Sequence, residues 1–345
     1  MGLLDLKIAW FTEGGWQGKV SLDNPNMRND VSTKWLIGAE HYSIFQLPQV
    51  LQHFGKNHFD IGIVTLPKTN TEQLLKFDMV GNLKKLCKKT ISMQEGPHWY
   101  FQDYSMEQQI WWYNSLTEFD MLFAHNWKDV NYYKGITNKP VKKMPTLMLA
   151  EKLNITSKRD NLIDKYGDLP SPSSYREKKV MIGGNMVRWY GGFDSMIVAR
   201  EFEMPISAPS MGRKIDREDE MDIQHLPYMT WVEWINTLAQ YYVGVHMMPT
   251  HAAGTFTLNC AFHGIPCIGY KGLDTQEDLH PLLSVDDGDL YGAIELADKL
   301  KDDDFYEPKH RELYRCLLDM HLNNETIDAI TIKNKLHKQK KKSIK

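Results

Sequence analysis

Short apolar runs alternate with longer amphipathic segments along the first 150 residues. The runs that have the pattern of buried strands are 6–12, 59–67 and 119–125, with a weaker one at 89–96. Segments with helical spacing lie between them, at about 32–53, 71–88, 105–117 and 126–134. Strands that alternate with helices in this way predict an α/β fold with a parallel, doubly wound sheet.

The same pattern begins again after a polar stretch at 151–178, which contains "PSPSS" and is the predicted linker. "KKVMIGG", "MPISAPS", "YYVGVHMMP" and "IPCIGY" have the pattern of strands, and "MTWVEWINTLAQ" that of a core-facing amphipathic helix. We therefore predict two Rossmann-like domains, 1–150 and 179–332, that face each other across a cleft. The last helix, about 308–332, can return to the first domain, and 333–345 form a basic tail. In such sheets ligands bind beyond the carboxyl ends of the strands.

Composition places the chain among globular proteins, since 42% of its 345 residues are hydrophobic and 25% are charged. The sequence contains no apolar span of 18 residues, so it gives no indication of a transmembrane helix. Asp5 and Lys7 interrupt the apolar core that a signal peptide would need, so we expect a cytoplasmic protein. The four cysteines are scattered without a C-x-x-C pair, which favours reduced thiols.

Charge is distributed unevenly along the chain. Residues 1–150 include 16 basic and 14 acidic residues, a net charge of +2. Residues 151–332 include 18 basic and 30 acidic residues, a net charge of −12. The tail adds seven lysines and no acid, which recovers the total of −3. Such a tail can contact a polyanion, but the acidic second half argues against nucleic acid wrapping the whole protein.

The stretch "HAAGTFTLNCAFHGIPCIG", 251–269, has the pattern of a loop, a helix, a tight turn and a buried strand. It resembles the C-terminal motif of GT-B glycosyltransferases, in which a Glu and a Phe-Gly pair precede Leu-Glu-Ala-Met-Ala-x-Gly-x-Pro-Val. Gly254, Leu258, Gly264 and Pro266 fall in register with that motif. His251 and Asn259 stand where the family has its two glutamates, which puts the retaining mechanism in doubt and leaves retaining or inverting transfer open.

The resemblance implies a nucleotide-diphosphate sugar as co-substrate, with no tightly bound cofactor. Backbone N–H groups at Gly254, Thr255 and Phe256 would face the phosphates at a helix N-terminus. The predicted donor-binding set is completed by the Thr255 and Thr257 hydroxyls, by Asn259 at a ribose, and by the glycine-rich loops with Gly14, Gly15, Gly184, Asn185 and Arg188. The alternative for 254–263 is an ordinary N-capped helix, and for Arg188 a surface arginine.

The acceptor side is predicted at "QEGPHW", which follows a strand in the first domain. A general base there must reach the acceptor hydroxyl. Glu95 or His98 is our candidate, and Asp103 is the next choice after them. His251 is the third candidate catalytic residue, acting on the leaving phosphate or the acceptor. The alternative is a turn closed by Gly96–Pro97. No metal-ligand spacing is found among the histidines and acids, so we predict no metal.

The leading hypothesis is a hexosyltransferase-like glycosyltransferase that acts on a glycan or lipid hydroxyl. A phage-type DNA-base glycosyltransferase is a second hypothesis, because "GGNMVR" resembles a loop of the phage DNA glucosyltransferases and because lysines gather in "KKLCKK" and the tail. A sugar-nucleotide epimerase, or a degenerate nucleotide- or glycan-binding protein, remain further alternatives.

Overall fold

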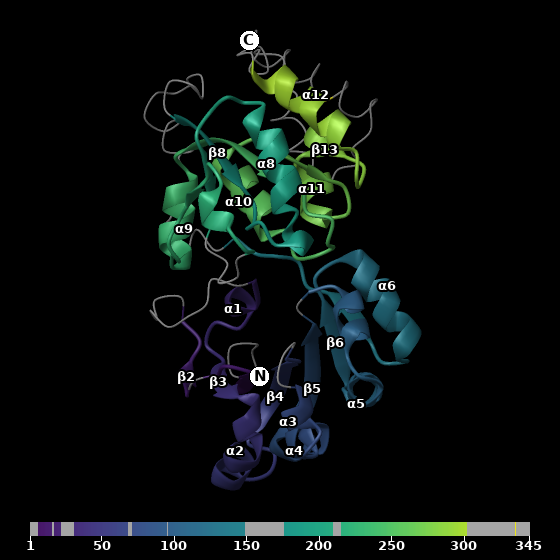
Figure 1. The fold of residues 1–345 in the computed structure, drawn as a ribbon. Helices are drawn as coiled ribbons and strands as arrows, with labels where there is room; N and C mark the ends of the chain where they lie inside the picture. The colour runs from purple at the N-terminus through teal and green to yellow at the C-terminus, as the bar shows by residue number, and fades with distance from the viewer. Residues whose placement is uncertain are drawn as a thin grey trace.

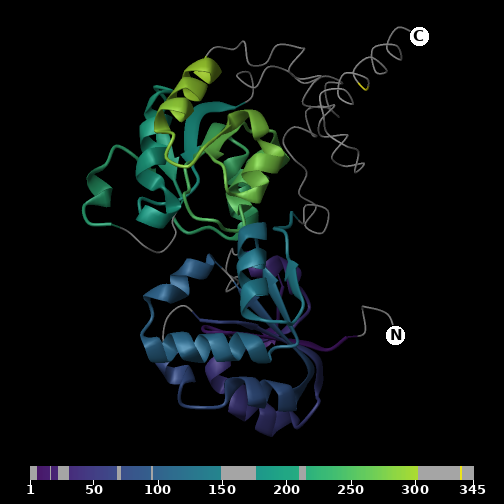
Figure 2. The same ribbon diagram turned by 90° about the vertical axis from the view of Figure 1, so that its right-hand side faces the viewer.

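The computed structural model describes residues 6–15, 17–21, 31–67, 71–94, 96–148, 176–209, 215–301 and 335. These residues form two lobes, one above the other in Figure 1 and Figure 2, and each lobe is built around its own sheet. We call the described residues up to 148 the first domain and 176–301 the second domain. Each is an α/β unit with a mainly parallel sheet, as the sequence pattern predicts.

The first sheet has the strand order β2-β3-β1-β4-β5-β6-β7, and all neighbours are parallel except β2 and β3. In β1, Phe11 packs into one core and Trp10 into the core on the opposite face, so helices and loops cover both faces. The strands are β1 (Ile8–Thr12), β2 (Gly18–Lys19), β3 (Glu40–Ser43), β4 (Phe59–Thr65), β5 (Cys87–Gln94), β6 (Met121–Ala124) and β7 (Val141–Lys143). The helices are α1 (Val31–Trp35), α2 (Leu47–Phe54), α3 (Thr71–Leu74), α4 (Met79–Leu86), α5 (Met106–Glu118) and α6 (Trp127–Ile136), with 3-10 turns η2 (Ile44–Gln46) and η3 (His98–Asp103).

The prediction of one helix over 32–53 is wrong, because this segment contains a strand between two helices. Gly38 has a φ of +89°, which ends the helical path after α1. His41 and Tyr42 then enter the sheet as β3, beside β1, with both side chains buried. Helical spacing and the period of a short strand cannot be separated over so few residues.

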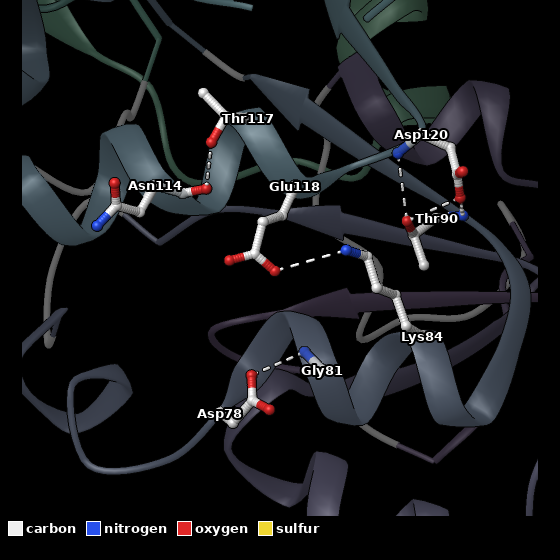
Figure 3. A network of polar contacts seen from close by, with 8 residues as sticks. All are labelled: Asp78, Gly81, Lys84, Thr90, Asn114, Thr117, Glu118 and Asp120. Atoms are coloured by element: carbon white, nitrogen blue, oxygen red, sulfur yellow. Dashed lines mark hydrogen bonds and ion pairs between the residues drawn. The ribbon is translucent and has the colours of Figure 1, made fainter.

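Polar contacts fix how α4 and α5 meet the sheet (Figure 3). Asp78 caps α4 by accepting a 2.8 Å hydrogen bond from the Gly81 N–H, and Lys84 pairs with Glu118 at 3.5 Å. The Asp120 carboxylate accepts hydrogen bonds from the Thr90 N–H at 2.9 Å and the Thr90 hydroxyl at 3.1 Å. Asp120 thereby sets the start of β6 against β5.

The second sheet has the order β10-β9-β8-β11-β12-β13, with every pair of neighbours parallel. Its strands are β8 (Glu177–Ile182), β9 (Ile206–Ala208), β10 (Gln224–His225), β11 (Tyr241–His246), β12 (Cys267–Tyr270) and β13 (Ser284–Val285). Its helices are α8 (Gly192–Arg200), α9 (Trp231–Leu238), α10 (Thr255–His263), α11 (Asp274–Leu279) and α12 (Leu290–Lys301), with 3-10 turns η6 (Arg188–Tyr190), η7 (Glu218–Glu220) and η8 (Pro281–Leu283).

The apolar face predicted for α9 is confirmed, since Trp231, Trp234, Ile235 and Leu238 are buried in one core cluster. Of the predicted linker only 176–178 are described, and two of these residues already belong to β8. The predicted helix at 308–332 and the basic tail, apart from Lys335, lie outside the described residues. No helix among the residues described is long and apolar enough to span a membrane.

Candidate functional site

The carboxyl-end loops of the two sheets contact each other. Lys128, just after β6, lies with its Nζ 2.8 Å from the Nε2 of His251, which follows β11. Lys143 at the end of β7 forms an ion pair with Asp274 at the start of α11. The Thr146 and Thr255 hydroxyl oxygens lie 3.3 Å apart. The start of α10 therefore sits where the two domains meet.

A glycine is required at the start of α10 for a steric reason. Gly254 has a φ of +67°, and a Cβ there would lie 1.8 Å from the Thr275 hydroxyl oxygen. The Gly254 carbonyl accepts hydrogen bonds from the Thr257 and Thr275 hydroxyls, both at 2.9 Å. This arrangement turns the chain into the helix and holds α10 against α11.

Two side chains of the predicted donor site face the interior instead. The Thr257 side chain is fully buried, and its hydroxyl is engaged by Gly254. Asn259 is also fully buried; its amide donates to the Thr255 carbonyl at 3.3 Å and accepts from the Trp234 indole N–H at 2.9 Å. Each side chain instead satisfies a buried polar group of the helix or its neighbour.

The backbone N–H groups of Thr255 and Phe256 belong to the first turn of α10. The Phe256 side chain packs against His246, with ring centroids 5.3 Å apart, so Phe256 offers only its amide. The first N–H groups of a helix have no partner within the helix and lie at the positive end of its dipole. The amides of Thr255 and Phe256 are the groups of the predicted set that lie at this helix N-terminus.

In the two glycine-rich loops, close packing explains why glycine stands at positions 15 and 184. A Cβ at Gly15 would lie 2.0 Å from the Tyr42 carbonyl, and one at Gly184 would lie 2.7 Å from the Tyr190 Cβ. Asn185 is 2% exposed, and its side-chain oxygen accepts a 3.2 Å hydrogen bond from the Val187 N–H. The side chain predicted to bind the donor thus closes the turn. Gly14 is exposed beside Gly15, and Arg188 is exposed at the start of η6.

His98 is held by a buried carboxylate. Asp129 Oδ1 accepts hydrogen bonds from the His98 backbone N–H at 3.1 Å and from its ring Nδ1 at 2.7 Å. Asp129 Oδ2 accepts a 2.8 Å hydrogen bond from Asn126. The His98 ring stacks on Tyr132 with centroids 4.0 Å apart. With Nδ1 as the donor, a neutral His98 carries its lone pair on Nε2.

The other predicted acceptor-side residues differ in position. Glu95 lies outside the described residues. Asp103 is exposed at the end of η3. Of the two that the structure describes, His98 is the one held by a buried carboxylate, with its Nδ1 2.7 Å from Asp129 Oδ1.

His251 is half-buried, and its surroundings favour the neutral ring. Burial lowers the pKa of His251, and the Lys128 ammonium lowers it further, against smaller opposing effects of the Gly272 carbonyl and of Asp129 and Asp274. A neutral imidazole can accept the hydrogen bond that the lysine donates. His251 is therefore an acceptor for a cation of the first domain in this structure.

The first turn of α6 contacts two predicted catalytic residues, His98 and His251. Asn126 caps this helix by accepting a 2.8 Å hydrogen bond from the Asp129 N–H. The consecutive residues Lys128 and Asp129 then reach His251 and His98, one in each domain. Sequence reasoning missed both residues of α6, although an Asn followed three residues later by an Asp, directly after an apolar strand, is a recognisable helix start.

In the described part of the chain, no three His, Cys, Asp or Glu side chains gather where they could hold a metal ion.

Solved structures of other proteins show which fold this arrangement has. HepE from Anabaena, in complex with UDP-glucose, is 12% identical, with a TM-score of 0.60 over 98% of this chain and 100% of HepE. Sucrose-phosphate synthase from Thermosynechococcus elongatus is 12% identical, with a TM-score of 0.55 over 97% of this chain and 89% of that enzyme. WaaG, a glycosyltransferase involved in lipopolysaccharide biosynthesis, is 8% identical, with a TM-score of 0.56 over 95% of this chain and 98% of WaaG. The chain has the GT-B fold of these glycosyltransferases, which confirms the fold predicted from the sequence.

Sequence comparisons add one local similarity. Residues 291–344 match the family model described as the DnaB-like helicase N terminal domain. The match begins in α12 and covers less than a sixth of the chain, so it does not define the family of the whole protein. No curated protein matches the chain.

Proposed function

We propose that this protein transfers a sugar from a nucleotide-diphosphate sugar to an acceptor hydroxyl, in the cleft between its two domains. The observation that carries the proposal is the position of α10, whose N-terminus lies among the cross-domain contacts of His251 and Thr255. A helix N-terminus at this point of a GT-B fold is suited to a diphosphate. The similar protein HepE was solved with UDP-glucose and with UDP and glucose.

His98 is our candidate for the general base on the acceptor side. Asp129 orients the ring through Nδ1, and Nε2 has no hydrogen-bond partner among the described residues. A base in this orientation can accept the proton of an acceptor hydroxyl. Asp129 acts through His98 and is therefore a positioning residue, comparable in role to the carboxylate that orients histidine in hydrolase triads.

The hypothesis of a DNA acceptor loses one of its supports. Lys84, Lys88 and Lys89 of "KKLCKK" pair with Glu118, Asp60 and Asp120 respectively. They also lie at or before the amino-terminal end of β5, about 20 Å along the strand from the carboxyl end that borders the cleft. We therefore favour a glycan or lipid hydroxyl over a modified DNA base as the acceptor.

Product analysis with a panel of nucleotide sugars tests the function. The full chain is incubated with UDP-, GDP-, ADP- and dTDP-hexoses, with and without glycan and lipid acceptors. We expect release of one nucleoside diphosphate, faster with the right acceptor and with the sugar recovered on it. Conversion of one nucleotide sugar into its epimer would establish the epimerase instead. Tight binding with no turnover would establish a degenerate binding protein.

A further inference from the structure

Three lysines of the first domain extend to the second. The Lys143 ammonium pairs with Asp274, and the Lys34 ammonium lies 5.0 Å from the centre of the Trp231 ring. Lys128 is different, because its partner is the His251 imidazole at 2.8 Å. Within the described chain no carboxylate forms a salt bridge with Lys128.

The carboxylates near Lys128 are engaged elsewhere. Asp129 accepts hydrogen bonds from His98 and Asn126, and Asp274 pairs with Lys143. Lys128 itself is an exposed residue on the first turn of α6. The positive charge at this point is thus held beside a ring that does not neutralise it.

Lys128 and the start of α10 belong to one small region. The His251 ring lies against Gly272, where a Cβ would be 2.8 Å from the ring Cε1. Gly254 likewise lies against Thr275, so these two contacts fall at the two ends of the four-residue stretch 272–275. The ring that binds the Lys128 ammonium and the glycine that precedes α10 therefore both lie against the segment 272–275. Positive groups in one region repel each other, and an anion that binds between them relieves this repulsion.

We propose that Lys128 binds the diphosphate of the sugar donor from the opposite domain, and that the His251 ring holds its ammonium in place until the donor arrives. The inference rests on the proposed function and adds to it a phosphate ligand supplied by the acceptor domain. Because the diphosphate would then contact both domains, donor binding would stabilise their closed arrangement.

Binding measurements on full-length variants test this inference. Calorimetric titrations with UDP, GDP, ADP and dTDP identify the nucleoside diphosphate that wild type binds most tightly, and its monophosphate and nucleoside serve as comparisons. Lys128→Met keeps the aliphatic stem and removes the charge. We expect it to weaken diphosphate binding at least about ten-fold, the loss of one charge-assisted hydrogen bond. The nucleoside should be affected less than two-fold. Lys128→Arg should recover part of the affinity.

Lys134→Met is the matched control, since Lys134 is an exposed lysine of the same helix. It should bind like wild type. If Lys128→Met binds the diphosphate within two-fold of wild type, or loses diphosphate and nucleoside equally, the inference about Lys128 is wrong while the proposed function stands. If wild type binds none of the four diphosphates, the proposed function fails, and the inference fails with it.

Discussion

Asp129 is the residue whose contacts say most about the acceptor side. Its side chain is 2% exposed, and its oxygens accept hydrogen bonds from His98 and Asn126. A buried carboxylate is stable only when such donors surround it. The His98 ring is consequently fixed in one orientation, with Nδ1 directed to Asp129.

Replacing Asp129 with Asn removes the charge and one strong acceptor while keeping the shape. We expect kcat for transfer to fall roughly 10²-fold, within the range of general acid–base contributions. The affinity for the nucleoside diphosphate should stay unchanged, because the Asp129 carboxylate contacts His98 and Asn126 and not the groups proposed to bind that ligand. Initial rates and calorimetric titration measure the two quantities, and the melting temperature reports whether the variant is folded. An unchanged kcat in a folded variant would remove Asp129 and His98 from the reaction.

At the scale of single residues, the sequence pattern identified the glycine and the polar residues around the start of α10. It did not predict what their side chains and backbone contact. Gly254 was expected to allow phosphates close to the backbone, and the structure gives it a positive φ and a close contact with Thr275. Thr257 and Asn259 stand at the right spacing, yet both side chains are buried. Their direction depends on Thr275 and Trp234, which are distant in sequence, and a linear pattern does not contain such contacts.

At the scale of elements, strands with continuous apolar runs were the most predictable. The runs near 59–67 and 119–125 became β4 and β6, and "YYVGVHMMP" supplied β11. The strand β3 was missed because its four residues mix Glu40 and His41 with Tyr42. Burial of such a polar strand follows from its neighbours in the sheet, where His41 stacks on Trp10.

The ends of two elements in the second domain carry buried histidines that should make this domain sensitive to acid. His246 ends β11 and His280 precedes η8, where its Nε2 donates to the Thr257 carbonyl at 3.0 Å. Burial lowers the pKa of each to about 4, from an ordinary value of 6.5. Between these values the unfolded chain binds protons that the folded chain does not. Stability is therefore full above pH 6.5 and is lost as the pH falls toward 4.

From pH 7 to pH 5 we expect each histidine to lower the free energy of unfolding by about 2 kcal/mol. Urea unfolding, followed by tryptophan fluorescence at the two pH values, measures this loss. The variants His246→Asn and His280→Gln should each show a smaller difference between pH 7 and pH 5 than wild type. Equal differences in all three proteins would show that these rings are not the source of acid sensitivity.

At the scale of the whole molecule, polar contacts at the carboxyl-end loops join the two domains. Lys128, Lys143 and Thr146 of the first domain meet His251, Asp274 and Thr255 of the second. Of these pairs, Lys128–His251 is exposed, and an exposed polar pair contributes little stability by itself. A ligand that adds contacts to both domains can therefore shift the balance between open and closed arrangements, as the proposed transferase requires.

The central claim is that a nucleotide-sugar diphosphate binds at the start of α10, between the domains. A crystal structure of the full chain with the tightest-binding nucleoside diphosphate tests it most directly. The account predicts phosphate oxygens at hydrogen-bond distance, about 2.7–3.2 Å, from the Thr255 and Phe256 amide nitrogens, with the Lys128 ammonium on the same diphosphate. A diphosphate bound elsewhere, with both amides left without contact to it, would contradict the account.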